Sequence, residues 1–591
     1  MYRAPISEIA HTLKHVTGLG TAMNNRSAGE LSSDLLDAIV EEAGKFASDE
    51  IAPLSAIGDV QGTTLQDGAV TMPEGWSDLY KRWCKGGWNA LTGPAEFGGQ
   101  DLPMALQTAA FEMWNSGSLA FGIGPTLTIG AIEAVNLHAS DELKSIYLEK
   151  LVSGEWTGTM NLTEPQSGSD LNGLKSRAEP LGDGRYRIFG QKIFITYGEH
   201  DMTDNIVHLV LARLPDAPPG QRGISLFLVP KFLVNDDGSL GARNDVFCHS
   251  VEHKLGIHAS PTCTMIYGDG RFSEEAGAIG WLVGEENRGL ACMFTMMNNA
   301  RLLVGIQGVA VAEAATQKAV AYANERRQGK ADGWDGEGMA PIVLHPDVQR
   351  NLLTMKALTA AARAICYNCA HAIDQSASED GAHWSDRAAL LTPIAKAFST
   401  DIGCDVASIG VQVHGGMGFV EETGAAQFMR DARIAPIYEG TNGIQAIDLV
   451  TRKLPLSGGD AANGYITELR EIIDQTRESN RQELAGLADA LTPALDDLQV
   501  STDYLLRRLE AGDRSSALSG AMPYLRLFGL ASGGCYLAKS ALASSDADFS
   551  ERAGLARFAV FNLLPETTSL RRVVEQGAQS LDGAGAMLKT A

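Results

Sequence analysis

The 591-residue chain is predicted to be mainly α-helical with a central β domain, because its hydrophobic periodicity changes twice. Apolar residues at three- and four-residue spacings mark residues 1–158 as an α domain. Residues 159–286 instead contain short runs rich in β-branched and aromatic residues, separated by Gly, Pro, Asp and Asn. Helical spacing returns from 287. Since 591 residues exceed one ordinary core, three or four domains are expected.

The elements follow from these patterns in chain order. The first domain has a helix-like stretch at 32–51 and a Gly/Pro-rich break at 93–103. The β domain has candidate strands at 186–196, 206–213 and 224–230, a hairpin turn at 182–184 and a loop at 235–245 that lacks the spacing of a calcium site. The second α domain, 287–455, has candidate helices ending near 327 and at 349–373, 386–413 and 443–453. A Gly-rich linker at 454–464 precedes a further helical domain at 465–591.

Composition restricts the kinds of partner. The chain has 48 basic and 72 acidic residues, a net charge of -24, which argues against binding nucleic acid or an anionic membrane surface. No later apolar run approaches the roughly 18 residues of a membrane span, and the N-terminus has charged residues and histidines in its first turns, so a cytoplasmic protein is expected. Cys366 and Cys369 form a CxxC without a second pair, so no metal site is expected.

One acidic residue stands out in the segment 430–447. Glu439 is flanked by Ile437, Tyr438 and Gly440, and desolvation in such surroundings would raise its pKa toward the range of a base for a weakly acidic C–H proton. The alternative is a solvated loop glutamate. The glycine-rich run at 411–419 predicts a second tight turn nearby.

A hydroxyl-rich loop lies where the first α domain gives way to the β domain. The run MNLTEPQSGSD at 160–170 supplies hydroxyls at Thr163, Ser167 and Ser169 and free amides around Gly168. These groups suit an acceptor-rich ligand, although such a run is also typical of a simple surface loop.

Six motifs occur in a characteristic order: TEPQSGSD, KIFIT, KLGIHASPT, NERRQGK, HGGMGF and IYEGT. With this order and spacing, residues 30–455 resemble the acyl-CoA dehydrogenase family. The resemblance implies an α domain, a β-barrel-like domain and an α-helical bundle, with FAD between the last two. The MYRAP start and the additional C-terminal α domain resemble a large bacterial subclass.

The resemblance also implies the residues that hold FAD. Seven would contact the flavin region: Met160, Leu162, Thr163, Gly168, Ser169, Phe194 and Thr196. Arg326 matches an arginine that reaches the FAD pyrophosphate of a neighbouring subunit, and the return contact matches Gln412, Gly415 and Gly416; this implies a homodimer, or a dimer of dimers. Thr441 matches a residue near the adenine side. Gly443 and Gln328 depart from the family pattern, in which glutamine and phenylalanine are common.

In the family, the thioester carbonyl accepts hydrogen bonds from a flavin ribityl hydroxyl and from the backbone N–H of the catalytic glutamate, here Glu439. The resemblance implies that Glu439 takes the α-proton while the β-hydride passes to flavin N5, giving a trans-2-enoyl-CoA. Arg301 would orient the base or the substrate. The expected substrate contacts are Ser169, Lys254, His258, Arg301, Tyr438 and Gly440. For Arg301, Lys254 and His258 the alternative is an ordinary surface side chain. Electron-transfer flavoprotein would then accept the electrons.

Two alternatives to this activity share the fold, and the substrate has an alternative of its own. An acyl-CoA oxidase usually has a histidine-containing flavin loop and a peroxisomal address, which TEPQSGSD and the ending MLKTA do not resemble. An inactive flavin-binding assembly protein is disfavoured by Glu439. For the substrate, the N-terminal residues resemble enzymes that convert 3-methylmercaptopropionyl-CoA to methylthioacryloyl-CoA in dimethylsulfoniopropionate demethylation; medium- and long-chain fatty acyl-CoA of β-oxidation are the alternative.

Overall fold

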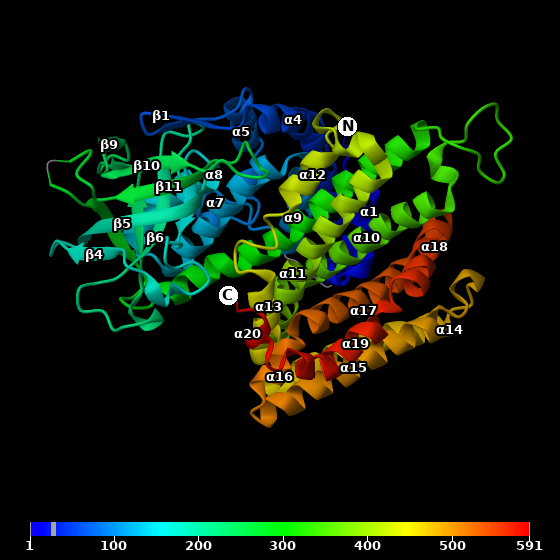
Figure 1. The fold of residues 1–591 in the computed structure, drawn as a ribbon. Coiled ribbons are helices and arrows are strands. Elements are labelled where there is room, and N and C mark those ends of the chain that lie inside the picture. Colours follow the sequence, from blue (N-terminus) through cyan, green and yellow to red (C-terminus); the bar gives the residue numbers. More distant parts are fainter. Residues whose placement is uncertain (1, 25–30, 274, 590–591) are drawn as a thin grey trace. The chain divides into compact units, whose positions relative to one another are not determined.

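The computed structural model describes residues 2–24, 31–273 and 275–589. The chain forms two compact units, each assembled from separate segments (Figure 1). We call the first the helical unit; it comprises Met1–Lys45, Met104–Ser116 and Arg301–Ala591. The second, the sheet unit, comprises Phe46–Pro103 and Gly117–Ala300. The predicted mainly α fold with a central β domain is confirmed.

The sheet unit contains an eight-stranded sheet and flanking helices. Its helices are α4 (Ala52–Gln61), α5 (Trp76–Lys85), α7 (Leu119–His138), α8 (Asp141–Ser153) and the first part of α9 (Gly289–Glu325). The main sheet contains β3 (Thr157–Asn161), β4 (Arg177–Pro180), β5 (Arg185–Thr196), β6 (Ile206–Ala212), β7 (Ser225–Pro230), β10 (Val246–Val251), β11 (Thr262–Tyr267) and β12 (Ala278–Val283). Two small hairpin sheets pair β1 (Thr64–Gln66) with β2 (Ala69–Thr71) and β8 (Phe232–Val234) with β9 (Leu240–Arg243).

The main sheet runs in the order β10-β11-β5-β12-β7-β6-β3, with β4 paired to β5. All pairs are antiparallel except β3 with β6. The three predicted strands correspond to β5, β6 and β7, and the predicted turn at 182–184 joins β4 to β5. The 235–245 segment contains the β8–β9 hairpin turn, closed by the Asn235 N–H donating to the Ser239 carbonyl over 2.9 Å.

Helices α7 and α8 supply much of the apolar core of this unit. Residues of both helices, such as Val135 and Leu148, form one buried cluster with Leu209 of β6 and Leu228 of β7. The start of α8 follows from its sequence, because the Ser140 hydroxyl accepts from the Leu143 N–H and two acidic residues occupy the first turn. Strand β3, which leads into the 160–170 loop, contributes Met160 to the same cluster, so the loop starts from a strand that is packed on this core.

The helical unit contains the other α-helices of the described residues. Its N-terminal part has α1 (Ile6–His11), α2 (Leu19–Asn24) and α3 (Ser33–Lys45), followed by α6 (Met104–Gly117) and the second part of α9. The central helices are α10 (Pro346–Gln375), α11 (Gly381–His414), α12 (Ala425–Ala432) and α13 (Asn442–Asp448). The C-terminal helices are α14 (Asp460–Glu478), α15 (Leu487–Glu510), α16 (Arg514–Ser519), α17 (Ala521–Leu542), α18 (Asp546–Asn562), α19 (Glu566–Gln576) and α20 (Ala584–Met587).

Helices α9 and α11 approach each other closely at small residues. A Cβ atom added at Gly308 would lie 2.2 Å from the Ser399 carbonyl oxygen, and one at Gly305 would lie 2.5 Å from that of Ala395. Glycine is required at both positions because no side chain fits between the two backbones. This contact brings the part of α9 that carries Arg301 and Gln307 beside the part of α11 that carries Lys396.

The connection to the C-terminal helices differs from the predicted linker at 454–464. Leu454 is fully buried, a short 3-10 turn follows at Leu456–Gly459, and α14 already begins at Asp460. Helices α14 and α17 belong to the same compact unit as α10 and α11. The Gly-rich composition therefore marks a tight turn with left-handed backbone at Gly458 and Gly459 rather than an extended linker.

Two helices are longer and more apolar than the sequence-based expectation allowed. By length and mean hydropathy, α7 and α9 could each cross a membrane. In the described residues, however, 89% of the most apolar window of α7 and 72% of that of α9 are buried inside the protein. Such burial is typical of core helices, whose apolar surface is covered by protein.

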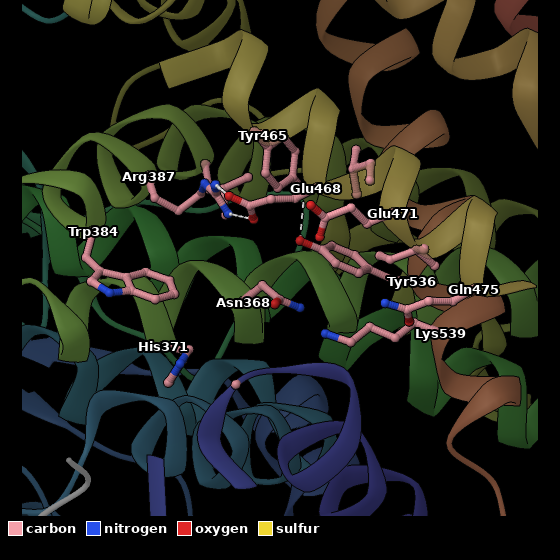
Figure 2. A pocket seen from close by; sticks show the side chains of 14 residues that line it. Asn368, His371, Trp384, Arg387, Tyr465, Glu468, Glu471, Gln475, Tyr536 and Lys539 are labelled. Carbon is pink, nitrogen blue, oxygen red and sulfur yellow. Dashed lines mark hydrogen bonds and ion pairs between the residues drawn. The ribbon is translucent and has the colours of Figure 1, made fainter. Parts of the chain in front are cut away.

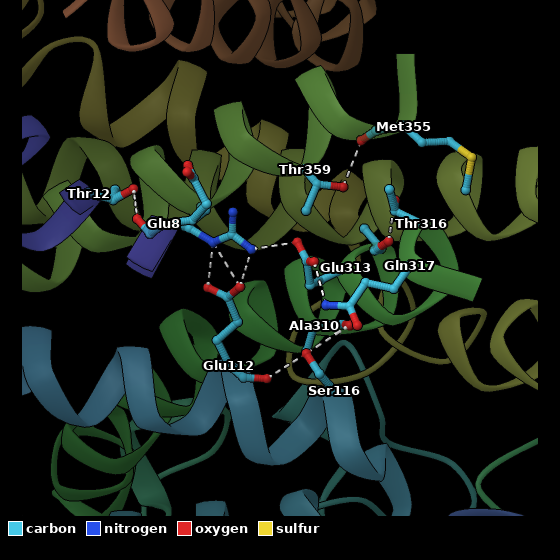
Figure 3. A network of polar contacts seen from close by, with 12 residues as sticks. Glu8, Thr12, Glu112, Ser116, Ala310, Glu313, Thr316, Gln317, Met355 and Thr359 are labelled. Carbon is cyan, nitrogen blue, oxygen red and sulfur yellow. Dashed lines mark hydrogen bonds and ion pairs between the residues drawn. The ribbon is translucent and has the colours of Figure 1, made fainter. Parts of the chain in front are cut away.

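A buried ion-pair network joins α6, α9 and α10 (Figure 3). The Arg363 Nε donates to Glu112 over 2.8 Å and its Nη2 donates to Glu313 over 2.8 Å. The Tyr367 hydroxyl donates to the second carboxylate oxygen of Glu112 over 2.6 Å. Arg363 and Glu112 are buried, so each charge depends on the others for the solvation that water would otherwise supply.

Replacing Arg363 by methionine is expected to destabilise the helical unit strongly, because Glu112 would be left buried without its cation. The loss of stability should be about 3–5 kcal/mol, against about 1 kcal/mol or less for Arg470→Met, which removes an exposed pair with Asp496. Thermal unfolding followed by circular dichroism measures both. Equal midpoints for the two variants would contradict the structural role of the network.

Candidate active site

Glu439 lies in the turn between α12 and α13, where the backbone is held in an uncommon conformation. Its φ is +53°, in the left-handed region that a residue with a side chain rarely adopts, and Gly440 follows with φ +86°. A non-glycine residue held there costs of the order of 1–3 kcal/mol, so the surrounding structure must impose it. Thr441 then caps α13, its hydroxyl accepting from the Ile444 N–H over 3.3 Å.

Asn442 anchors this turn to α11. Its backbone N–H donates to the Pro436 carbonyl over 3.0 Å, closing the turn around Glu439. Its side-chain oxygen accepts from Lys396 Nζ over 2.9 Å, and its side-chain nitrogen donates to Asp401 over 2.7 Å. Lys396 and Asn442 are both buried. The polar network therefore fixes the position of the Glu439 backbone relative to α11.

The surroundings of the Glu439 carboxyl shift its pKa toward neutral pH. Burial raises its pKa to about 7, against the opposing effects of the positive charges of Arg301 and Lys396. This agrees with the desolvated carboxylate expected from its apolar neighbours. Arg301 is itself buried, 8% exposed, so it is not a surface side chain that merely extends to solvent. Burial also lowers the pKa of Lys396, to about 7, although Glu439 and Asp401 oppose that shift.

The hydroxyl of Tyr438, the residue before the candidate base, is hydrogen-bonded within the protein. It donates to Gln307 Oε1 of α9, and burial raises the pKa of the phenol far above its usual range. Gly440 has no room for a side chain, since an added Cβ would lie 2.6 Å from Gln445 Nε2. Tyr438 and Gly440, both predicted as substrate contacts, therefore help to fix the conformation of the turn. Because Gly440 has no side chain, another group can approach its backbone closely.

In the sheet unit, a buried ion pair organises the hydroxyl-rich loop. Lys192 Nζ of β5 contacts Glu164 over 2.8 Å and donates to the Leu162 carbonyl over 3.0 Å. The Glu164 carboxylate also accepts from the backbone N–H groups of Lys175 and Ser176. Although burial alone would raise it, the pKa of Glu164 is lowered to about 2 by Lys192 and these hydrogen bonds. The loop is therefore held in one conformation by its own polar groups.

The exposed side of this loop offers a mixed apolar and polar surface. Phe194 is 59% exposed with φ +59°, beside a register shift between β5 and β11. Met160 is buried in β3, Leu162, Thr163 and Thr196 are half-buried, and Gly168 and Ser169 are exposed. An exposed aromatic ring beside hydroxyl and amide donors fits a flat heterocycle that carries carbonyl and ring-nitrogen acceptors, as the isoalloxazine of FAD does.

Most of the other predicted site residues are exposed, and His258 is instead hydrogen-bonded within the protein. The side chains of Arg326 and Gln412 are exposed, and Cβ atoms added at Gly415 and Gly416 would meet nothing within 4 Å. Lys254 is half-buried. His258 has both ring nitrogens engaged, Nδ1 with the Asp59 carbonyl at 2.9 Å and Nε2 with the Lys254 carbonyl at 3.0 Å. Its imidazole therefore ties α4 to the 254–262 loop instead of presenting a nitrogen to a ligand.

Sequence reasoning missed four residues that position the site: Glu164, Lys192, Lys396 and Asn442. Glu164 lies in TEPQSGSD and Lys192 in KIFIT, but the resemblance assigns contacts only to their neighbours in these motifs. Lys396 lies in a helix where one lysine among apolar residues is an ordinary pattern. A lysine on the apolar side of a helix, opposite a predicted buried carboxylate, was the available signal.

Comparisons with known proteins bear on both units. Four family models match this chain: acyl-CoA dehydrogenase N-terminal domain at 33–155, middle domain at 159–269, C-terminal domain at 287–454, and acetyl-CoA dehydrogenase C-terminal like at 465–582. The 3-methylmercaptopropionyl-CoA dehydrogenase of Ruegeria pomeroyi is 45% identical over 92% of this chain and 91% of its own length. A butyryl-CoA dehydrogenase of Syntrophomonas wolfei is 36% identical over 75% of this chain and 73% of its own.

Solved structures agree in fold. The structure of an acyl-CoA dehydrogenase complexed with FAD from Bacillus anthracis matches 95% of this chain and 92% of its own, with a TM-score of 0.72 at 21% identity. With the family models spanning most of the sequence and a relative of 45% identity along nearly its whole length, the chain belongs to the acyl-CoA dehydrogenase family.

Proposed function

We propose that this FAD-dependent acyl-CoA dehydrogenase acts on 3-methylmercaptopropionyl-CoA, forming methylthioacryloyl-CoA, with Glu439 as the base. The observation that carries the substrate is the 45% identity over 92% of the chain to a 3-methylmercaptopropionyl-CoA dehydrogenase, against 36% over 75% to a butyryl-CoA dehydrogenase. The alternative is a medium- or long-chain fatty acyl-CoA.

Glu439 removes the α-proton of the thioester. A carboxyl whose pKa is about 7 is a stronger base than an ordinary glutamate and is still ionised to a large extent at neutral pH. The positive charges of Arg301 and Lys396 lower the pKa of Glu439 against the effect of burial, so part of the Glu439 carboxyl groups stay ionised. The backbone N–H of Glu439 donates to the thioester oxygen as negative charge develops there. When bound, FAD supplies the two-electron acceptor for the hydrogen that leaves Cβ.

The flavin is held by the exposed side of the hydroxyl-rich loop and by the end of β5. The residues assigned to it are Met160, Leu162, Thr163, Gly168, Ser169, Phe194 and Thr196, with Thr441 near the adenine side. The exposure of Arg326 and Gln412, together with the open glycines 415 and 416, supports contacts to the FAD of a second subunit and hence a homodimer or a dimer of dimers. Electron-transfer flavoprotein is the proposed acceptor, in the cytoplasm.

The substrate contacts are proposed residue by residue within each unit. Arg301 lies close to the turn, its Nη2 being 3.9 Å from the position of a Cβ added at Gly440, so it orients the base and the adjacent thioester. Ser169 is proposed to contribute its hydroxyl, and Tyr438 and Gly440 are proposed to contribute their backbone. On the CoA side Lys254 is the proposed cation, whereas His258 acts by holding the Lys254 loop to α4.

Glu439→Gln should retain FAD but reduce it at least about a hundredfold more slowly on mixing with acyl-CoA, because the amide cannot accept the α-proton. General-base catalysis is typically worth about 10²- to 10⁴-fold. Anaerobic stopped-flow absorbance measures the rate, and the flavin-to-protein ratio reports folding. Glu510→Gln, at the end of α15, is the matched control and should reduce its flavin at the wild-type rate. A Glu439→Gln variant as fast as wild type would assign the base elsewhere.

The rate of flavin reduction should rise between about pH 6 and 8 and level off above, because Glu439 must lose its proton before it can act and its pKa is about 7. Lys396→Met removes a charge that lowers this pKa, so the midpoint should move to higher pH. Lys356→Met, an exposed lysine paired with Glu551, should leave the midpoint unchanged. A midpoint that moves to lower pH in Lys396→Met would contradict the electrostatic assignment.

Among acyl-CoA substrates, 3-methylmercaptopropionyl-CoA should have a kcat/KM at least equal to that of butyryl-CoA and well above that of palmitoyl-CoA, because a pocket shaped for a short thioether chain excludes a long one. Dye reduction across a chain-length series measures this. Highest kcat/KM for chains of twelve or more carbons would instead place the enzyme in general fatty acid oxidation.

A further inference from the structure

A cavity of about 360 Å³ lies within the helical unit, away from the Glu439 turn (Figure 2). Its walls come from α10 and α11 on one side and from the C-terminal helices α14 and α17 on the other. This volume is in the range of small-molecule binding sites, at the lower end. None of the residues assigned to acyl-CoA or FAD lines it, so its chemistry is separate from the dehydrogenase reaction.

The cationic groups of the cavity differ in how they are compensated. Arg387 donates from Nη1 to Glu468 over 2.8 Å and from Nη2 to the other carboxylate oxygen, so these two charges neutralise each other. Lys539 is half-buried, and within the described part of the chain no carboxylate oxygen lies within 4.0 Å of its Nζ. Burial lowers the pKa of Lys539 against the charge of Glu468, so this ammonium group has lost part of its hydration without a carboxylate in direct contact.

A neutral donor reaches the same region as this ammonium group. Figure 2 shows the Asn368 and Lys539 side chains extending toward the same part of the cavity. One N–H of the Asn368 amide donates to the Ala364 carbonyl over 2.8 Å, which leaves its second N–H for another acceptor. An ammonium and an amide together suit a carboxylate, which accepts through two oxygens.

The end of the cavity away from Lys539 carries Trp384 and His371 (Figure 2). The Trp384 indole packs edge-on against His371 at 5.5 Å between ring centroids. Leu391, Leu469 and Ile472 also line the cavity and add apolar surface. His371 is 5% exposed, and its Nδ1 has no hydrogen-bond partner in the described structure. Burial lowers the pKa of His371 to about 4, so the ring is neutral at pH 7 and adds no second cation. A buried nitrogen without a partner calls for a ligand or a water molecule.

We propose that this cavity binds a small carboxylate with an apolar body, its charge held by Lys539 and Asn368 and its body placed against Trp384. A phosphate or another dianion is disfavoured, because the charge of Arg387 is already paired with that of Glu468 and because Glu471 also lines the cavity. The ligand would join α14 and α17 to α10 and α11, and binding would therefore stabilise the attachment of the C-terminal helices.

The test uses the full-length FAD-loaded protein with benzoate and butyrate as probes and benzamide as the neutral isostere of benzoate. Isothermal titration should show saturable binding of a carboxylate with an unchanged visible flavin spectrum, and thermal unfolding should move to higher temperature. Lys539→Met should weaken binding at least about tenfold, since a hydrogen bond to a charged group is lost. Lys539→Arg should stay within about threefold of wild type, and Lys356→Met, far out on the surface of α10, should not differ from wild type.

Tighter binding of benzoate than butyrate supports an aromatic ligand, and the reverse supports an aliphatic one; either supports the carboxylate assignment. Trp384→Ala removes the indole from the cavity wall but keeps the ammonium group of Lys539, so it should weaken benzoate binding by a similar factor. This second variant tests the proposal if Lys539→Met folds poorly. The proposal is overturned by benzamide binding as tightly as benzoate, by unchanged affinity in both variants, by a perturbed flavin spectrum, or by no binding at all.

Discussion

The candidate active site depends on one constraint: a half-buried carboxylate and a fully buried lysine lie within the same helical unit. Isolated charges in such surroundings are costly, so Glu439 and Lys396 are acceptable only because Arg301, Asn442 and Asp401 complete the network. The network in turn requires α9 and α11 to be close, and the glycines at 305 and 308 permit that approach. The left-handed backbone of Glu439 is the local cost of this arrangement, imposed by the turn that Asn442 closes.

The sheet unit uses the same physical device for a different purpose. Lys192 and Glu164 are buried and paired, and the carboxylate also collects two backbone N–H groups of the loop that follows. A buried pair of this kind adds little net stability compared with apolar residues, but it penalises every loop conformation in which one charge is left alone. The half-buried Thr163 and the exposed Ser169 can therefore offer their hydroxyl groups to a ligand with little further ordering, which is what a cofactor site requires.

Sequence reasoning succeeded where the signal is local. Strands β5, β6 and β7 were predictable because β-branched and aromatic runs end at turn residues, and Glu439 was conspicuous because its neighbours are apolar. It failed where the cause is distant in the chain. Lys396 gains its importance from Asn442, 46 residues further along, and the turn at 454–459 reads as a flexible linker until Leu454 is seen to be buried. The apolar length of α7 and α9 was missed because scattered polar residues interrupt runs that a helical core tolerates.

The shared pKa of about 7 for Glu439 and Lys396 has a consequence for the chemistry. When the base takes a proton, the site loses a negative charge, and the same change removes part of what keeps Lys396 protonated. The two groups are therefore coupled, and a proton gained at Glu439 favours loss of one from Lys396. Because Lys396 tends to lose a proton when Glu439 gains one, the net charge of this poorly hydrated site changes little. A lysine at this position thus does more than strengthen or weaken the base, because it also moderates the electrostatic cost of proton transfer into the interior.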